Sequence, residues 1–319
     1  MLVRRPPVDN PPPIEDEEKH NKKKGKQKMG RNSHYFKGKE ENALRAKELY
    51  EKIENDEQLM GTTSYSVEHS FIYSPEDREQ LSIRDERYYS YKKPIIEISD
   101  TNTAMAIWNE NSYEVVAGIN RIVAALNFAS YKNPGGMFLK GSMAQEESLC
   151  HSSNLYNILS RFPEYYSLNK KNLNNSLYCD RAIFSPMVLF FGTNTVHPCD
   201  IITCAAPNRY AAQRYNKVSD EENWYTLYNR IEFVLDIANK QGVDVLILGA
   251  YGCGVFGQNP YEVAAIFKYL LENKKYCFEK VIFAIPKGTR SDNYTPFYQV
   301  FKDPNFETKN PFIKHLLKL

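Results

Sequence analysis

From residue 94 onward, short apolar runs alternate with longer stretches in which apolar residues recur at helical spacing. The apolar runs are rich in Val, Ile and Phe, a composition typical of strands. The later runs are almost continuously apolar, which is typical of strands covered on both faces of a sheet. The predicted strands span residues 94–99, 121–128, 181–191, 200–206, 243–250 and 280–285. The predicted helices lie near residues 101–109, 145–160, 221–240, 260–272 and 292–301. This alternation predicts a three-layer α/β/α fold with a mixed, largely parallel sheet.

The N-terminal part of the chain shows a different pattern. Residues 41–59 have the spacing of one amphipathic helix, whereas residues 60–93 are rich in tyrosine and show no clear period. Residues 1–38 contain many Pro, Lys, Asn and Glu residues and few large apolar ones, a composition that predicts disorder. The sequence therefore predicts a disordered basic tail over residues 1–38, a helical or irregular N-terminal extension over 39–93, and an α/β domain over 94–319.

Charge is unevenly distributed along the chain. Of its 41 basic residues, nine lie between Lys19 and Lys39, where there is no acidic residue. The rest of the chain carries 32 basic and 39 acidic residues, a net charge of −7, so the body cannot bind a polyanion through overall charge. The stretch NKKKGKQK over 21–28 is open to three interpretations: a nuclear address, a patch that contacts nucleic acid or a charged polymer, or a solvated tail.

Two further features bear on the location of the protein. The longest apolar runs are broken by glycine and too short to span a bilayer, and the N-terminus lacks the apolar core of a secretory signal. The six cysteines form no Cys-x-x-Cys pair and the six histidines are scattered, so no metal site or cofactor is predicted. We expect an intracellular protein without a membrane contact, cytoplasmic, or nuclear if the host is eukaryotic.

Two glycine-containing segments follow predicted strands. The first, NPGGMFLKGSMAQEE over 133–147, comes after the strand at 121–128, and the second, GAYGCGVFGQNP over 249–260, comes after the strand at 243–250. In open α/β sheets, ligands bind beyond the carboxyl ends of the strands. We therefore expect both loops to open at the same edge of the sheet and to form a ligand site there.

The second loop contains Gly252, Gly254 and Gly257 in a Gly-x-Gly-x-x-Gly spacing. Glycines let the backbone approach phosphate oxygens, and the N-terminus of the following helix favours negative charge. The loop lies late in the chain, and the acid about twenty residues further on, Glu272, falls at the end of a predicted helix. This context disfavours a nicotinamide dinucleotide site and favours a pyrophosphate cradle. The alternative is that the glycines serve only tight turns.

The first loop ends in two neighbouring acids, Glu146 and Glu147. Adjacent residues on a helix point about 100° apart, so these carboxyls cannot face each other across a glycosidic bond. One can transfer a proton while the other holds a sugar hydroxyl. A carboxyl in an apolar pocket beside a second carboxylate has a raised pKa, which suits a general acid at neutral pH. The alternative is a solvated first turn of a helix.

Three ordered blocks resemble one known family. LNFASYKNPGGMFLKGSMAQEESLCHSSNLY over 126–156 closely resembles the signature of microbial-type poly(ADP-ribose) glycohydrolases, a glycine triplet followed after a short spacer by Gln-Glu-Glu. Here Gly135, Gly136 and Met137 precede seven spacer residues and the QEE at 145–147. IITCAAPN over 201–208 and LGAYGCGVFG over 248–257 resemble the next two blocks in order and spacing.

The resemblance implies that residues 94–319 form a macro domain that binds ADP-ribose at the edge of the sheet and hydrolyses poly(ADP-ribose). It implies Glu147 as catalytic acid/base and Glu146 as the carboxyl that holds the ribose beside the scissile bond. The implied partners are poly(ADP-ribose) or ADP-ribosylated proteins. The implied ADP-ribose-binding residues are Asn127, Asn133, Gly135, Gly136, Gln145, Gly252, Cys253, Gly254, Val255, Phe256 and Gly257.

One position departs from the family pattern, because Met137 replaces the third glycine. If this position needs a positive φ, the loop must shift and carry the acids with it. If it needs only space, the side chain can point outward and activity is retained, which we favour. The alternatives are an inactive ADP-ribose reader, or a hydrolase of mono-ADP-ribosyl substrates or O-acetyl-ADP-ribose. A negative φ at Met137, with Glu147 facing the cleft, would support the enzyme.

Overall fold

The computed structural model describes residues 31–81, 92–118, 121–288 and 291–318. The tail predicted to be disordered lies mostly outside these ranges. Helix α1 (Arg31–Asn55) begins inside the last part of that predicted tail and belongs to the folded extension.

A seven-stranded sheet organises the fold, in the order β1-β4-β5-β3-β6-β7-β2. Strands β5, β3, β6, β7 and β2 run parallel to one another, whereas β4 is antiparallel to β5 and β1 is antiparallel to β4. The strands are β1 (Phe71–Tyr73), β2 (Ile95–Ser99), β3 (Val123–Phe128), β4 (Ala182–Phe191), β5 (Val196–Cys204), β6 (Val245–Leu248) and β7 (Lys280–Ala284). All six predicted strands are confirmed. β1 was not predicted because three residues carry no readable period.

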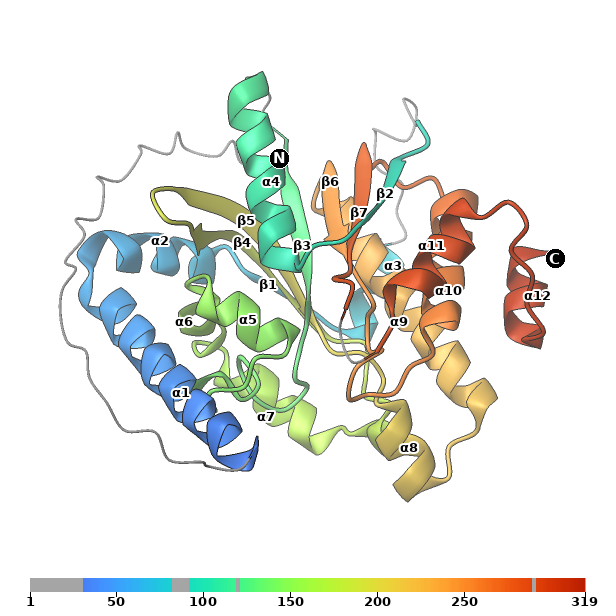
Figure 1. Ribbon diagram of the computed structural model, residues 1–319, viewed down its shortest axis with the longest axis horizontal. Helices are drawn as coiled ribbons and strands as arrows, with labels where there is room; N and C mark the ends of the chain where they lie inside the picture. The colour runs from blue at the N-terminus through green and yellow to red at the C-terminus, as the bar shows by residue number, and fades with distance from the viewer. Residues whose placement is uncertain (1–30, 82–91, 119–120, 289–290, 319) are drawn as a thin grey trace.

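Both faces of the sheet are covered by helices (Figure 1). Along β3, Ala124 and Leu126 belong to one apolar cluster, and Val123 and Ala125 belong to the other. The first cluster takes in α3 (Arg78–Leu81), α9 (Asp220–Lys240), α10 (Pro260–Asn273), α11 (Tyr294–Lys302) and α12 (Pro311–Leu317). The second takes in α1, α4 (Thr103–Ala117), α5 (Gln145–His151), α6 (Leu155–Leu159) and α7 (Pro163–Lys171). This confirms the three-layer fold and explains the continuously apolar central strands.

The predicted helix over residues 41–59 is wrong in its extent, because α1 ends at Asn55 and α2 (Glu57–Glu68) begins a new helix. The break lies at Asp56, whose Oδ1 accepts the backbone N–H groups of Gln58 and Leu59, both at 3.0 Å. Aspartate at this position satisfies N–H groups that have no partner within the helix. Part of the stretch we considered irregular, residues 60–81, therefore contains most of α2 together with β1 and α3.

The predicted helix over 145–160 is also interrupted, between α5 and α6. The interruption contains Asn154, which is fully buried. Its Oδ1 accepts the N–H of Leu189 on β4 at 2.9 Å, and its Nδ2 donates to Thr63 Oγ1 on α2 at 3.0 Å. The side chain thus ties the chain to both the sheet and the N-terminal extension. No periodicity could reveal this break, because it depends on distant partners.

The N-terminal extension packs directly on the first glycine-containing loop. Gly141 has φ +75°, and a Cβ placed on it would lie 1.9 Å from the backbone oxygen of Lys39 on α1. Further along, Asn157 Nδ2 on α6 donates to Glu54 Oε1 on α1 at 2.8 Å. The extension is therefore a support for the loop that carries the candidate acids. Within the described ranges, no helix is long and apolar enough to cross a membrane.

Candidate active site

The two glycine-containing loops leave the sheet side by side. β3 and β6 are adjacent parallel strands, with Ala125 opposite Ile247. The segment after β3 leads to α5, and the segment after β6 leads to α10. Both loops therefore lie at the carboxyl edge of the sheet, where the sequence predicted the ligand site.

Two consecutive glycines form the turn beneath the carboxyls. Gly135 and Gly136 have φ values of +59° and +60°. A Cβ on Gly136 would lie 2.6 Å from Glu147 Oε1 and 3.1 Å from Glu146 Oε2. Both the backbone conformation and the close approach of the acids therefore require glycine at this position. Asn133 closes the turn, since its carbonyl accepts the Gly136 N–H at 3.2 Å.

The two acids are buried in the first turn of α5, and they converge over Gly136. Glu146 has both oxygens engaged: Oε2 accepts the Ser130 N–H at 2.6 Å, and Oε1 accepts from Asn127 Nδ2 at 3.3 Å. Glu147 accepts the Met137 N–H on Oε1 at 2.9 Å. Its Oε2 has no protein donor among the described residues. The alternative of a solvated first turn is wrong, because Glu146 is 3% and Glu147 is 7% exposed.

The side chain of Gln145 joins α5 to the sheet by hydrogen bonds. Its Oε1 accepts the N–H of Phe128 at 2.8 Å, and its Nε2 donates to Leu126 O at 2.9 Å and to Thr103 Oγ1 at 3.2 Å. Both ends of the amide are thus engaged by β3 and α4. We infer that Gln145 acts by holding the neighbouring acids in place.

The pKa of Glu146 is raised to about 8, chiefly by burial and to a smaller extent by the charge of Glu147, against the opposing effect of hydrogen bonds from Ser130, Asn127 and the Gly135 backbone. Desolvation disfavours the ionised form of a carboxyl, and this effect is the largest of them. The unliganded carboxyl pair therefore holds a proton at neutral pH.

This pKa predicts that the unliganded protein loses stability as the pH rises. The folded state keeps the Glu146 proton between its ordinary pKa of 4.5 and about 8, whereas the unfolded chain releases it. Between those values the free energy of unfolding falls by on the order of 1.4 kcal/mol per pH unit from this group, and above about pH 8 the loss is complete. We expect Glu146→Gln to remove the decline in urea denaturation at pH 5 and pH 8. Equal declines in both proteins would assign it to other groups.

Met137 adopts φ −112° and ψ 29°, a conformation open to any residue. Its side chain is 40% exposed, and its N–H holds Glu147. The position therefore contributes a backbone donor and space, and it does not require glycine.

Met137→Gly should consequently leave the rate of substrate hydrolysis within about threefold of wild type, since Glu147 keeps its backbone donor. Glycine should lower the free energy of unfolding by about 0.5–1 kcal/mol through added backbone freedom. Steady-state kinetics and chemical denaturation measure the two effects. A gain of more than tenfold in kcat would show that the methionine side chain obstructs the cleft.

The second loop presents unused backbone donors. Gly252 and Gly257 have φ values of +74° and +71°, and the turn closes through Gly257 N–H to Gly254 O at 3.0 Å. The N–H groups of Gly254, Val255 and Phe256 have no backbone acceptor within the described part of the chain. Three consecutive free donors before the N-terminus of α10 suit a diphosphate. Cys253 differs: its N–H is bonded to Ala250 O at 3.1 Å, and burial raises the pKa of its thiol.

Aromatic residues that the sequence did not single out border the site. Tyr131, which lies between β3 and the first loop, stacks on Tyr178 with ring centroids 4.2 Å apart. Tyr178 in turn meets Phe256 of the second loop edge-on at 6.1 Å. Tyr178 has φ +65°, and the preceding Asn174, Asn175 and Ser176 also have positive φ. Non-glycine residues in this conformation are strained, and such strain concentrates at functional sites.

A fully buried arginine holds this strained segment. The guanidinium of Arg230 on α9 donates to the carbonyls of Leu177 and Tyr178 at 3.3 and 3.1 Å, and also to Ala205 O. Its charge is paired with Asp180. The sequence signal for this role was available but unused: Arg230 interrupts the apolar face of a strongly amphipathic helix.

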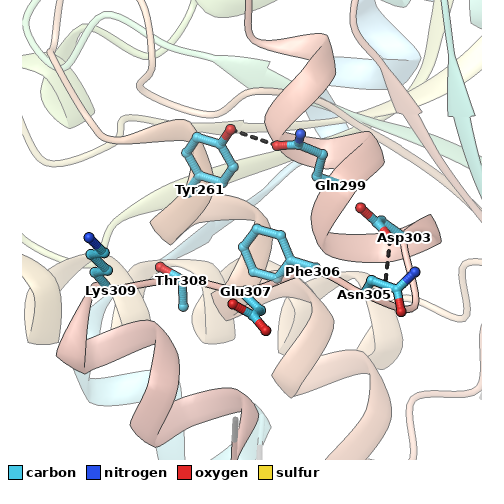
Figure 2. Close-up of a pocket in the computed structure, with 8 residues that line it drawn as sticks. All are labelled: Tyr261, Gln299, Asp303, Asn305, Phe306, Glu307, Thr308 and Lys309. Atoms are coloured by element: carbon cyan, nitrogen blue, oxygen red, sulfur yellow. Dashed lines mark hydrogen bonds between the residues drawn. The ribbon is translucent and has the colours of Figure 1, made fainter.

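A separate pocket of about 410 Å³ lies between α10, α11 and the segment that joins α11 to α12 (Figure 2). Tyr261 lines it, donates its hydroxyl proton to Gln299 Oε1 at 2.7 Å and stacks on Phe306. The pocket contains no predicted catalytic or ADP-ribose-binding residue. It is therefore not the candidate active site.

The fold and the site define a class: a macro-type α/β protein with a buried carboxyl pair between a glycine turn and an anion-binding loop. The family model described as "Microbial-type PARG, catalytic domain" matches residues 38–193. The poly(ADP-ribose) glycohydrolase from Deinococcus radiodurans, in complex with ADP-ribose, is 32% identical over 75% of this chain and 96% of that chain, with a TM-score of 0.67. The chain belongs to the microbial-type poly(ADP-ribose) glycohydrolase family, and it is a glycosidase.

A second solved relative extends the match. The poly(ADP-ribose) glycohydrolase from Thermomonospora curvata is 29% identical over 82% of this chain and 100% of that chain, with a TM-score of 0.71. The same enzyme bound to the inhibitor ADP-HPD gives a TM-score of 0.69. A comparison with curated protein sequences gave no match.

Proposed function

We propose that this protein hydrolyses the ribose–ribose O-glycosidic bond of poly(ADP-ribose) and releases ADP-ribose, with Glu147 as general acid/base. The observation that carries the proposal is the position of Glu147, which has one oxygen held by the Met137 N–H and the other without a protein partner among the described residues. A carboxyl that is oriented but not saturated can reach a substrate oxygen. The relatives solved with ADP-ribose and with ADP-HPD support a ligand of this class.

In the proposed mechanism, Glu147 gives its proton to the leaving ribose oxygen as the bond to the anomeric carbon breaks. The sugar becomes oxocarbenium-like, and water attacks its anomeric carbon while Glu147 takes back a proton. One water is consumed and two hydroxyl ends are formed. The diphosphate is held by the free N–H groups of Gly254, Val255 and Phe256, so the sugar stays in place during the reaction.

In this mechanism Glu146 supplies the proton, because its pKa is raised. In the unliganded site, Glu146 holds a proton at neutral pH because burial disfavours its ionised form. When a ribose hydroxyl donates to Glu146, its ionised form is stabilised and the proton becomes available to Glu147.

The backbone conformation at Met137 favours hydrolysis over binding of ADP-ribose without turnover. Its φ of −112° means that the departure from glycine leaves the turn unstrained and the acid in position. We infer that poly(ADP-ribose) or ADP-ribosylated proteins are the partners. Contact between the basic tail and a polyanion stays a prediction, because residues 1–30 lie outside the described ranges.

The test is the release of ADP-ribose from an automodified poly(ADP-ribose) polymerase, followed by chromatography of the products. We expect free ADP-ribose as the product. Absence of release, with ADP-ribose still binding in calorimetry, would make the protein a reader and overturn the proposal.

A further inference from the structure

Helix α8 (Arg209–Asn216) exposes two tyrosines around one arginine. Tyr210 is 52% and Tyr215 is 69% exposed. The Arg214 guanidinium lies 5.5 Å from the centroid of the Tyr210 ring and 5.7 Å from that of Tyr215, and it also donates to the Tyr210 hydroxyl. Within the described part of the chain, no carboxylate lies within ion-pair distance of Arg214. We call these three residues the α8 patch.

The acidic residue that contacts α8, Asp220, is already paired within the protein. Asp220, which begins α9, accepts from Arg209 and from Gln213, both at 2.6 Å. These contacts lower the pKa of Asp220 and use its charge within the protein. Arg214 is therefore an unpaired cation on a protein body that carries a net negative charge.

The α8 patch is continuous with the candidate active site. The Tyr210 N–H donates to Phe256 O at 3.0 Å, so α8 begins on the loop that presents the free N–H groups. A Cβ on Gly257 would lie 3.4 Å from Tyr210 Cβ. Val255, between those donors, is 86% exposed. α8 follows β5, which flanks β3 on the side away from β6 and β7, and it lies at the end of the sheet from which both loops leave (Figure 1).

Exposed aromatic rings with a guanidinium are the groups that bind the bases and phosphates of single-stranded nucleotide polymers. The rings offer stacking faces to any base, and an unpaired guanidinium makes strong hydrogen bonds to phosphate oxygens. The substrate of the proposed reaction carries both groups in every unit. One ADP-ribose unit fills the site between the two loops, so the remaining units of the polymer must extend over the protein surface beside that site.

We propose that the α8 patch is a second subsite that binds the next ADP-ribose unit of the polymer, its adenine stacked on Tyr215 and its diphosphate paired with Arg214. This inference rests on the proposed function, since it places the remainder of the same substrate. It makes long polymer a tighter ligand than ADP-ribose alone, although the protein body is acidic.

Binding to Glu147→Gln protein tests the subsite without turnover. We expect Tyr215→Ala and Arg214→Ala, each added to this background, to weaken the Kd for defined-length poly(ADP-ribose) about five- to tenfold. The Kd for free ADP-ribose should stay within twofold. Phe71→Ala is the matched aromatic control, since Phe71 is 60% exposed on the edge strand β1, which β4 separates from the strand β5 that precedes α8. Lys240→Ala, in the last turn of α9, is the charge control.

Three results would overturn the subsite. If the substitutions leave the polymer Kd unchanged, the α8 patch does not contact the polymer. If they weaken ADP-ribose binding as much as polymer binding, α8 belongs to the first site. Competition by single-stranded oligoadenylate as strong as by poly(ADP-ribose) would assign the surface to nucleic acid. The proposed function fails separately: wild-type protein that binds polymer through α8 but releases no ADP-ribose would keep the subsite and refute the hydrolase.

Discussion

Glu147→Gln should lower the rate of ADP-ribose release by about a thousandfold or more and leave ADP-ribose binding within a fewfold of wild type. General acid–base catalysis by a positioned side chain contributes about 10²–10⁴-fold, and in the proposed mechanism one carboxyl performs both proton transfers. Glutamine keeps the size of the side chain and an oxygen that can accept the Met137 N–H. It cannot donate a proton to the leaving oxygen or take one from water.

Single-turnover kinetics on defined polymer, with calorimetry of ADP-ribose binding, separates chemistry from affinity. Glu164→Gln is a matched control, because Glu164 is an exposed carboxyl in the first turn of the nearby helix α7. It should release ADP-ribose at the wild-type rate. If Glu147→Gln still releases ADP-ribose, another residue is the general acid. If it no longer binds ADP-ribose, Glu147 is needed for the shape of the site.

The central half of the fold was predictable because its signals are local. The strands at β3, β6 and β7 are almost continuously apolar, since each is covered by helices on both faces. Their carboxyl ends then placed both glycine-containing loops at one edge without any knowledge of side-chain contacts. The same reasoning predicted the position of the carboxyl pair. Its burial could not be predicted, because two neighbouring acids in a sequence do not show whether they are buried.

The elements that were missed depend on partners far away in the sequence. Asn154 breaks the predicted helix because Leu189 and Thr63 bind its side chain, and neither is near it in the chain. The Tyr131–Tyr178 stack joins two loops, and the buried Arg230 holds it from a third element. Sequence periodicity records which face of an element is buried, but not which groups meet across it.

The backbone angle at Met137 decides whether the turn tolerates a residue other than glycine at the third position of the triplet. From the sequence, a missing third glycine was compatible with either an intact or a displaced turn. The structure places the strict requirement at Gly135 and Gly136, whose φ values are positive, and not at the third position. The family's glycine triplet thus contains positions with different physical roles.

Gly136→Ala should therefore be far more damaging than Met137→Gly. Its φ of +60° costs an L-residue roughly 1–2 kcal/mol in unfolding free energy. The new methyl would also lie 2.6 Å from Glu147 Oε1, so either the turn or the Glu147 carboxyl must move. Displacement of a catalytic group by about 1 Å can cost about a hundredfold in rate, and we expect at least that loss in kcat.

Gly61→Ala separates this effect from glycine replacement in general. Gly61 lies within α2, and a Cβ there would have nothing within 4 Å. Alanine should raise the free energy of unfolding by about 0.5–1 kcal/mol and leave kcat unchanged, because it favours the helix. If Gly136→Ala folds and keeps wild-type kcat, the turn can relax without moving Glu147. The close approach at Gly136 would then be a feature of packing and not a requirement of the chemistry.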